Sequence, residues 1–345
     1  MADPRAGTAM TSETPVRIAS NTKTFVAASV LRLAEAGKLD IDDPISKHLP
    51  AEPVALLAGD GYRPDEMTIR HLLTHTSGLF DHTSGEEYAR AITSDPMHRW
   101  TPLEQLRLAV RLGAPHGPPG ELYTYCDTGY VLLGQIIEAV TGQNLAQAVR
   151  ALVGFDRLGL DATWWEILEP APAGIPKKAH HFLGELDCTD FDPSYDLYGG
   201  GGLVASMPDL ARFFRALFAG KVFEHPATLQ LMLTGVAGLR AIPGASAKAL
   251  PPGVYRMGIW TEEIGGHQVW RHSGFWGTSA VYVPDLDAVI TCTVNQNQNR
   301  GAMDRLTARA IAIVADAMRA QLAGTATSGQ RRWGAAAGAI ATWAR

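Results

Sequence analysis

The stretch Ser20-Asn21-Thr22-Lys23 stands near the start of the chain and begins a run with helical hydrophobic spacing. Apolar residues recur every three or four positions through residues 21–36, and Gly37 supplies a C-terminal stop. A serine three residues before a lysine at a helix start places a hydroxyl and an amine on one face, close enough for the amine to take the hydroxyl proton. The helix N-terminus also favours the neutral amine, and the N–H of Ser20 can point at a developing oxyanion. Ser20 could equally be an ordinary N-cap, and the two roles are compatible.

Two further segments carry residues suited to the same chemistry, Tyr125-Cys126-Asp127 and His272-Ser273-Gly274. A tyrosine beside the serine and lysine could carry a proton to a leaving group. The strand that carries His272 could form the opposite wall of a cleft, with Gly274 allowing a substrate backbone to approach closely. Each segment is weak alone, and it is the set of three that indicates a site.

The composition excludes several functional classes. The 345 residues are 46% hydrophobic and 19% charged, which is ordinary for a globular protein and excludes global disorder. Thirty basic and 35 acidic side chains give a net charge of −5, so nucleic acid is not expected as a partner. No apolar run of about 18 residues indicates a membrane span, and three widely spaced cysteines fit neither a disulfide framework nor a Cys-x-x-Cys site.

The pattern along the chain indicates an α+β fold, an antiparallel sheet flanked by helices, with a helical lobe over roughly residues 38–200. Helices are predicted over residues 68–76, 127–141, 208–220 and 301–322, and strands over 254–262, 267–272, 278–283 and 288–294. Residues 1–322 would form one two-lobed domain. Residues 323–345, rich in Ala, Gly and Arg, would form a poorly ordered tail.

Five motifs, in order along the chain, resemble those of the serine hydrolases related to class C β-lactamases, D-alanyl-D-alanine carboxypeptidases, D-aminopeptidases and β-lactamase-like esterases. The motifs are Arg-Ile-Ala-Ser-Asn-Thr-Lys at 17–23, His-Leu-Leu-Thr-His-Thr-Ser-Gly-Leu at 71–79, Tyr-Cys-Asp-Thr-Gly-Tyr at 125–130 with Leu-Leu-Gly at 132–134, Gly-Gly-Leu at 201–203 with Asp-Leu-Ala at 209–211, and His-Ser-Gly at 272–274. The resemblance covers residue 17 to about residue 322, and the ordered set is highly specific. It implies a β-lactamase/transpeptidase-like fold.

The resemblance also implies a role for each matching residue. Ser20 would be the acylated nucleophile, Lys23 its general-base partner and Tyr125 a second acid or base. His272 would stand where family members carry Lys or His, and the oxyanion hole would be formed by the N–H groups of Ser20 and Phe275. The reaction would be a two-step acyl transfer on an ester, amide or D-amino-acid peptide, with water releasing the acyl-enzyme. The expected partner is a small molecule or short peptide, and neither a cofactor nor a metal is implied; the alternative is a non-catalytic member with a binding or scaffolding role.

The second motif departs from the usual pattern, because it commonly ends in Asn and here ends in Asp127. A carboxylate near the Lys23 amine favours the ammonium form and makes Lys23 a weaker base. We therefore hypothesise that Tyr125 carries more of the base role. A pH–rate profile of Asp127→Asn that matched wild type would contradict this.

The third motif departs as well, since His272 replaces a constant positive charge with a group that is mostly neutral at pH 7–8, having an unperturbed pKa of about 6.5. Arg271 is next to it, but neighbouring residues on a strand point to opposite faces. Anchoring of a substrate carboxylate is therefore weaker. We expect esters, amides or D-amino-acid peptides to be preferred over penicillins, with only weak β-lactamase activity.

The front of the chain is short, with only 19 residues before Ser20, whereas relatives place a helix and two sheet strands there. The resemblance therefore predicts that the N-terminal helix and the first two strands are missing, which would leave one sheet edge unpaired. As given, the chain carries no signal peptide and would be cytoplasmic. It would be exported if the true start lies upstream.

Some conspicuous residues have simpler interpretations. His71 and His75 are spaced i, i+4, but no third ligand follows at zincin spacing, so packing is favoured over a metal. Cys126 is predicted to be a buried small hydrophobe rather than a reactive thiol. Trp164 and Trp165 could line the cleft or pack between the two lobes. Trp276 is the better candidate for the cleft.

Overall fold

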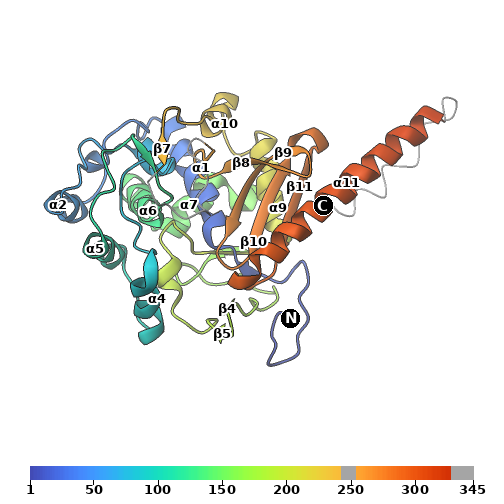
Figure 1. The fold of residues 1–345 in the computed structure, drawn as a ribbon, viewed down its shortest axis with the longest axis horizontal. Helices are drawn as coiled ribbons and strands as arrows, with labels where there is room; N and C mark the ends of the chain where they lie inside the picture. Colours follow the sequence, from blue (N-terminus) through green and yellow to red (C-terminus); the bar gives the residue numbers. More distant parts are fainter. Residues whose placement is uncertain (242–253, 328–345) are drawn as a thin grey trace.

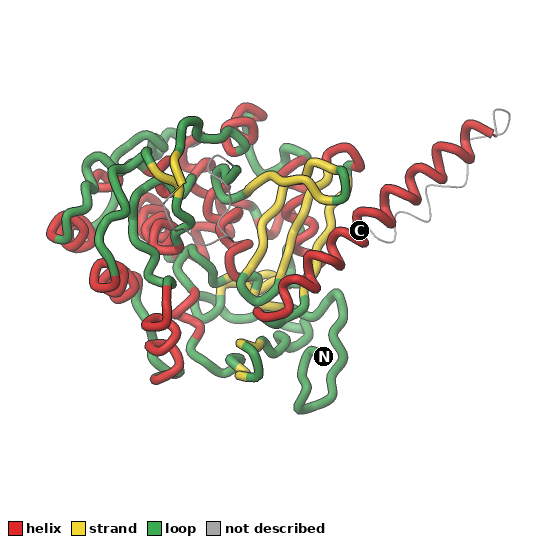
Figure 2. Tube along the Cα trace, in the orientation of Figure 1, coloured by secondary structure: helices red, strands yellow, loops and turns green. Residues whose placement is uncertain are grey.

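The computed structural model describes residues 1–241 and 254–327. A helical half and a sheet half lie side by side, with helix α1 (Thr22–Glu35) between them (Figure 1). The strands of the largest sheet gather on one side of the molecule, and helices and loops make up the other (Figure 2). This is the predicted α+β arrangement. No helix in the two described segments is long and apolar enough to cross a bilayer.

The largest sheet has four antiparallel strands in the order β11-β10-β9-β8. Their bounds are β8 Trp260–Ile264, β9 His267–Gly274, β10 Thr278–Val283 and β11 Ala288–Thr293. Strand β10 has the predicted bounds, and β9 and β11 differ from prediction by two residues or fewer. A tight turn at Gly265-Gly266, where both residues have positive φ, joins β8 to β9.

The prediction of a strand over residues 254–262 was wrong for the first part of that range, because β8 begins only at Trp260. Residues just before it bend against helix α1 instead. Gly258 has φ +72°, and a Cβ there would lie 2.6 Å from the Lys23 carbonyl oxygen. The Gly258 carbonyl accepts a hydrogen bond from the Thr24 hydroxyl at 2.7 Å. Contact with the helix therefore overrides the strand propensity of this segment.

Alternate side chains of β10 pack against different helices, as the twofold period of a strand requires. Val281 and Val283 belong to a cluster with Ile311 of α11 (Arg300–Thr327). The ring of Tyr282 stacks on Phe218 of α9 (Met207–Phe218), with ring centroids 4.2 Å apart. The sheet is thus covered by α11 on one face and α9 on the other. Helix α11 reaches Thr327, so the first five residues of the predicted tail are helical, and the rest of that tail lies outside the described residues.

The helical half is built around α1, whose side chains are nearly all buried. Helix α6 (Asp127–Thr141) has the predicted bounds and ends at Gly142, which has φ +67°. Helix α3 (Ile69–Leu73) is shorter than predicted because Thr68 is its N-cap. The remaining helices are α2 Ala51–Gly59, α4 Gly85–Ser94, α5 Pro102–Leu112, α7 Leu145–Val153, α8 Phe155–Leu158 and α10 Pro226–Met232.

A small antiparallel sheet leads the chain into α1. Its strands are β1 Val16–Arg17, β6 Leu203–Ala205 and β3 Thr163–Trp165, in the order β1-β6-β3. Two further pairs are β2 Leu122–Tyr123 with β7 Arg240–Ala241, and β4 Phe182–Leu183 with β5 Leu186–Asp187. Both tryptophans of β3 are buried, which supports lobe packing over a place in the cleft.

Candidate active site

Ser20 lies in a short 3-10 turn, η1 (Ala19–Asn21), that joins β1 to α1. It is not an N-cap, because Ile18 and Asn21 occupy the cap positions of η1 and α1 and neither makes a side-chain cap bond. Ala19, the residue just before it, has φ +44°, a left-handed conformation that is costly for a residue with a Cβ. The Ser20 hydroxyl instead accepts a hydrogen bond from Lys23 Nζ at 2.9 Å.

The Lys23 side chain is fully buried and its Nζ has three acceptors. They are Ser20 Oγ at 2.9 Å, the Gly200 carbonyl at 2.6 Å, and the Asp127 carboxylate, with which it forms an ion pair. An ammonium has three N–H donors, so this arrangement satisfies all of them. In the structure, Lys23 is therefore placed as an ammonium, which agrees with the expectation drawn from Asp127.

The four-glycine run at 199–202 is what brings a carbonyl to Lys23. Gly199 has φ +119°, and a Cβ there would lie 2.4 Å from the Tyr130 carbonyl oxygen. A Cβ at Gly200 would lie 3.1 Å from Asp127 Oδ1. Close approach to α6 therefore requires residues without side chains at these positions.

Tyr125 lies beside Ser20, whose hydroxyl acts to lower the pKa of the phenol. Lys23 Nζ lies 5.0 Å from the centre of the Tyr125 ring. Burial, and then the negative charge of Asp127, raise the pKa of Tyr125 well above its usual value of 10. The phenol therefore stays protonated around neutral pH and suits proton donation. This weighs against the hypothesis that Tyr125 carries more of the base role.

His272 is buried, and both of its ring nitrogens are engaged. Nδ1 lies 2.9 Å from the Ser273 carbonyl, so it carries the proton, and Nε2 accepts a hydrogen bond from the Tyr255 hydroxyl at 3.0 Å. Burial, and then the charge of Lys23, hold the pKa of His272 well below 6.5. The imidazole is neutral. Arg271 points to the other face, as expected, and pairs there with acidic side chains.

The third motif ends against the residues that lead into η1, the turn that carries Ser20. A Cβ on Gly274 would lie 2.3 Å from the Ile18 carbonyl oxygen, so close contact with the protein's own backbone requires a glycine at this position. The close approach of a substrate backbone at Gly274 stays a prediction, and packing within the chain is a separate reason for a glycine here. The Thr278 hydroxyl donates to the same Ile18 carbonyl at 3.1 Å, and the Asn21 amide donates to Ile18 O at 2.9 Å. Gly274, the residue before Phe275, therefore packs against the residues that lead into the turn with Ser20.

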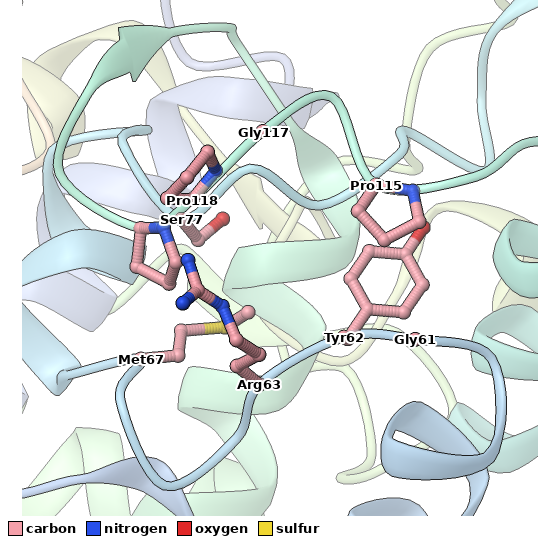
Figure 3. A pocket seen from close by; sticks show the side chains of 9 residues that line it. Gly61, Tyr62, Arg63, Met67, Ser77, Pro115, Gly117 and Pro118 are labelled. Atoms are coloured by element: carbon pink, nitrogen blue, oxygen red, sulfur yellow. The ribbon is translucent and has the colours of Figure 1, made fainter.

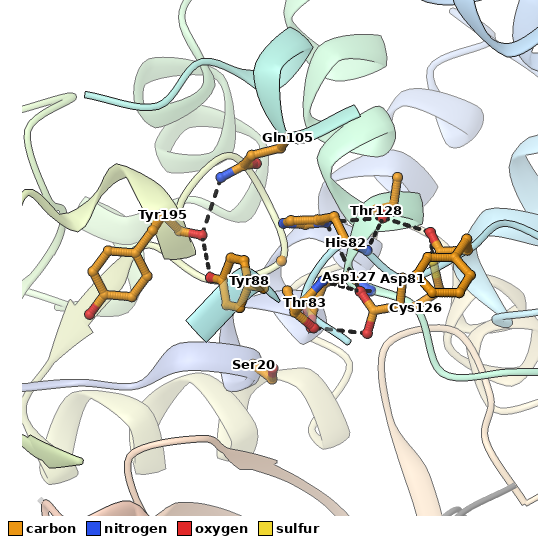
Figure 4. A network of polar contacts seen from close by, with 12 residues as sticks. Ser20, Asp81, His82, Thr83, Tyr88, Gln105, Cys126, Asp127, Thr128 and Tyr195 are labelled. Carbon is orange, nitrogen blue, oxygen red and sulfur yellow. Dashed lines mark hydrogen bonds and ion pairs between the residues drawn. The ribbon is translucent and has the colours of Figure 1, made fainter. Parts of the chain in front are cut away.

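Two residues of this site were missed in the sequence, Asp81 and Thr83. The Thr83 hydroxyl lies 2.8 Å from Asp81 Oδ2 and 3.2 Å from Asp127 Oδ2, and the Asp127 N–H donates to Asp81 Oδ1 at 3.1 Å (Figure 4). Burial, and then the charge of Asp127, raise the pKa of Asp81 to about 7. The polar run directly after the 71–79 motif was the available signal, although it carries no recognisable spacing.

Other conspicuous residues take structural places. His71 Nδ1 accepts from the Thr68 N–H, and His75 Nδ1 accepts from the Cys126 N–H, both at 3.1 Å. Across the described residues, no group of three or more His, Cys, Asp or Glu could hold a metal ion. Cys126 is buried, and burial raises the pKa of its thiol.

Trp276 does not line an open cleft. Its side chain is 2% exposed and packs in a cluster with Ala19, Cys188 and Tyr195. The two chain segments that meet in this cluster, around Tyr88 and around Tyr195, are joined by a hydrogen bond from the Tyr88 hydroxyl to the Tyr195 carbonyl at 2.9 Å. An apolar cluster therefore lies directly behind the residue that precedes Ser20.

A separate cavity of about 230 Å³ lies elsewhere (Figure 3). Its lining includes Tyr62, Arg63, Ser77 and Pro115. It contains none of the residues that surround Ser20. The Arg63 guanidinium at its rim is already paired with Glu66 at 2.7 Å.

Asp196 is a second carboxyl with a strongly shifted protonation equilibrium, since burial, and then the charge of Asp127, raise its pKa from 3.8 to about 7. A raised carboxyl pKa means that stability is fully present below pH 4 and is lost as pH rises through about 7. Replacing Asp196 by asparagine should therefore raise Tm on the order of a few degrees at pH 8 and leave it unchanged near pH 4. The exposed Asp161→Asn is the control, and an Asp196→Asn gain that did not grow with pH would contradict the prediction.

Solved structures define the class of protein to which this fold and site belong. A D-stereospecific amidohydrolase from Streptomyces sp. superposes with a TM-score of 0.69 at 27% identity, covering 82% of this chain and 83% of that one. A D-amino acid amidase from Ochrobactrum anthropi superposes with a TM-score of 0.72 at 25% identity, covering 93% and 88%. The fold is the β-lactamase/transpeptidase-like fold.

The chain belongs to the β-lactamase family, whose sequence model matches residues 1–315. Esterase EstB from Burkholderia gladioli is 37% identical over 277 residues, which are 73% of this chain and 68% of EstB. The putative penicillin-binding protein PbpX from Bacillus subtilis is 28% identical over 220 residues, so the chain spans about half, 50%, of that protein. Family and relatives together support a hydrolase.

Proposed function

We propose that the protein is a serine hydrolase that forms an acyl-enzyme on Ser20 and acts on esters or amides. The observation that carries the proposal is the 2.9 Å contact between Ser20 Oγ and the buried Lys23 Nζ, at the start of a helix and beside Tyr125. The Ser20 oxygen attacks the carbonyl carbon, the oxyanion is bound by the N–H groups of Ser20 and Phe275, and the leaving group departs with a proton. Water then cleaves the Ser20 ester.

Each proton in this reaction needs an acceptor and a donor. Lys23 must first give a proton to Asp127, its ion-pair partner, before its nitrogen can take the proton of Ser20. Tyr125 lies beside Ser20 and remains protonated, so it can donate to the departing oxygen or nitrogen and be reprotonated from Lys23. Tyr125 is thereby assigned the acid role and Lys23 the base role.

The charges of the site favour substrates that carry no carboxylate next to the reacting carbonyl. His272 is neutral, Arg271 points to the other face of the sheet, and the Lys23 ammonium is paired with the Asp127 carboxylate. Among the described residues around Ser20, these groups leave no cation to anchor a carboxylate in the way that a lysine at position 272 would. Similarity to an esterase and to a D-stereospecific amidohydrolase supports the same preference.

A matched pair of substrates tests this preference. Benzylpenicillin and its methyl ester differ only in the carboxylate, and a charged hydrogen bond to that group is worth about 1.5–3 kcal/mol, or roughly 10–100-fold. We expect Ser20 to be acylated by the methyl ester at least as fast as by the free acid, and p-nitrophenyl butyrate to be turned over faster than either. A tenfold or greater preference for the free acid would contradict the assignment of His272 as neutral.

The competing function is a non-catalytic protein that keeps the fold for binding. It predicts that no acylating reagent labels Ser20. Family membership alone does not separate the two, whereas the buried contact of Ser20 with Lys23 favours the enzyme, because a binding role gives no reason to bury an ammonium against a hydroxyl.

A further inference from the structure

The Thr83 hydroxyl connects two carboxyl groups but has only one hydrogen. Its oxygen lies 2.8 Å from Asp81 Oδ2 and 3.2 Å from Asp127 Oδ2 (Figure 4). One hydroxyl cannot donate to both oxygens, so a satisfied chain requires a second proton on one of the two carboxyl groups. The chain Asp81–Thr83–Asp127–Lys23–Ser20 therefore has two possible directions of donation.

In the first direction, Asp81 is protonated and donates to Thr83, which donates to the Asp127 carboxylate. Asp127 then faces the Lys23 ammonium, and Nζ donates to Ser20 Oγ. In this state Lys23 has no lone pair and cannot act as a base. One ammonium and one carboxylate balance each other.

In the second direction, Asp81 is ionised and accepts from Thr83. Asp127 carries a proton on Oδ2 and donates it to Thr83, while Oδ1 accepts from a neutral Lys23 amine. That amine donates its two hydrogens to Asp127 and to the Gly200 carbonyl, and its lone pair accepts the Ser20 hydroxyl proton. The second state contains one proton fewer than the first, released to solvent, and only the second has Lys23 ready to act.

We propose that Asp81, acting through Thr83, is a positioning residue that decides whether the proton shared by Lys23 and Asp127 lies on nitrogen or on oxygen, and so whether Lys23 can serve as a base. This rests on the proposed function. It assigns no contact between Asp81 and the substrate.

Electrostatics favour the same coupling. The charged and titratable groups that face Asp81 among the described residues are Asp127, Lys23, Cys126, Tyr88, Tyr125 and, with ring nitrogen 4.0 Å from Oδ1, His82. Burial holds the pKa of His82 down at about 4, so it is neutral. The effect of Asp127 on the Asp81 pKa, which lies at about 7, exceeds that of Lys23. An ionised Asp81 therefore repels the Asp127 carboxylate more than it attracts the Lys23 ammonium, and it favours the neutral pair.

The test is the pH dependence of Ser20 acylation in wild type and Asp81→Asn. Wild type should gain about tenfold per pH unit below pH 7 and reach a plateau above it, because the active state lacks one proton. In Asp81→Asn, Oδ1 still accepts from the Asp127 N–H, which leaves the Nδ2 group to donate to Thr83 and locks the first direction. The acylation rate of Asp81→Asn should therefore be lower than that of wild type by about tenfold or more at pH 8 and by little at pH 5.5. The variant should no longer show a rate that depends on pH near pH 7. Its KM should change less than its kcat.

Asp196→Asn is the matched control, because Asp196 also titrates near pH 7, whereas the Thr83 hydroxyl contacts Asp81 and Asp127 and, among the described residues, not Asp196. It should keep the dependence near pH 7. Thr83→Val should weaken that dependence, and Thr83→Ser should restore it. If Asp81→Asn kept the wild-type profile, or if Asp196→Asn removed it, the proposal would be overturned.

A second measurement separates this proposal from the hydrolase assignment. In protein with 15N-labelled lysine side chains, the Nζ signal of Lys23, assigned by its loss in Lys23→Met, should move toward a neutral amine as pH rises through 7 and stay an ammonium in Asp81→Asn. This result without any acylation would refute the hydrolase and retain the coupling. Acylation of Ser20 together with a Lys23 signal that Asp81→Asn does not change would support the hydrolase and overturn the coupling.

Discussion

Replacing Ser20 with alanine should reduce kcat/KM for p-nitrophenyl butyrate by about 10³-fold or more, since removal of a nucleophile leaves only binding and oxyanion stabilisation. The fold should tolerate the change, because Ser20 makes no cap bond and its hydroxyl is partly exposed. Hydrolysis followed by p-nitrophenol release, with Tm as the folding control, checks both statements.

Ser29→Ala is the matched control for that variant. Ser29 lies on α1, the helix that follows Ser20, is fully buried, and donates to the Phe25 carbonyl at 2.9 Å. Its loss should cost about 1 kcal/mol of stability and leave kcat/KM near that of wild type. Equal losses of activity in the two variants would indicate that Ser20 matters through folding and not through attack.

Replacing Lys23 with methionine should lower kcat by about 10³-fold, because Ser20 then has no base within hydrogen-bond reach. Stability should fall as well. Asp127 loses its ion-pair partner, and the Gly200 carbonyl loses a donor. The kinetic and thermal effects therefore have different causes and can be separated.

The double variant Lys23→Met/Asp127→Asn makes the separation. It removes the unpaired carboxylate, so Tm should recover toward wild type while kcat stays low. Recovery of activity together with Tm would contradict the base role of Lys23. Failure of both to recover would point to the Gly200 carbonyl as the main loss.

Regular elements with complete local signals could be predicted from the sequence. Helix α6 has an apolar stripe that ends at Gly142, and β10 is an alternating strand between turn residues, so both have the predicted bounds. The segment before Trp260 could not be predicted. Its sequence favours a strand, whereas contact of Gly258 with the helix that carries Lys23 decides its course, and that contact joins residues far apart in the chain.

The same distinction applies to the site. Ser20 and Lys23 are one helical turn apart, so their contact follows from local geometry. Asp81 and Thr83 reach the site only because the loop after α3 returns to the start of α6, which no short motif encodes. His272 was placed on the correct strand, but its low pKa depends on burial and on the charge of Lys23, which comes from a segment far away in the chain.

Peptide mapping by mass spectrometry after treatment with a fluorophosphonate tests the central claim most directly. The account predicts one adduct per chain, on the peptide containing Ser20, absent from Ser20→Ala and retained in Ser29→Ala. An adduct on another serine, or none on folded protein at pH 8, would contradict it.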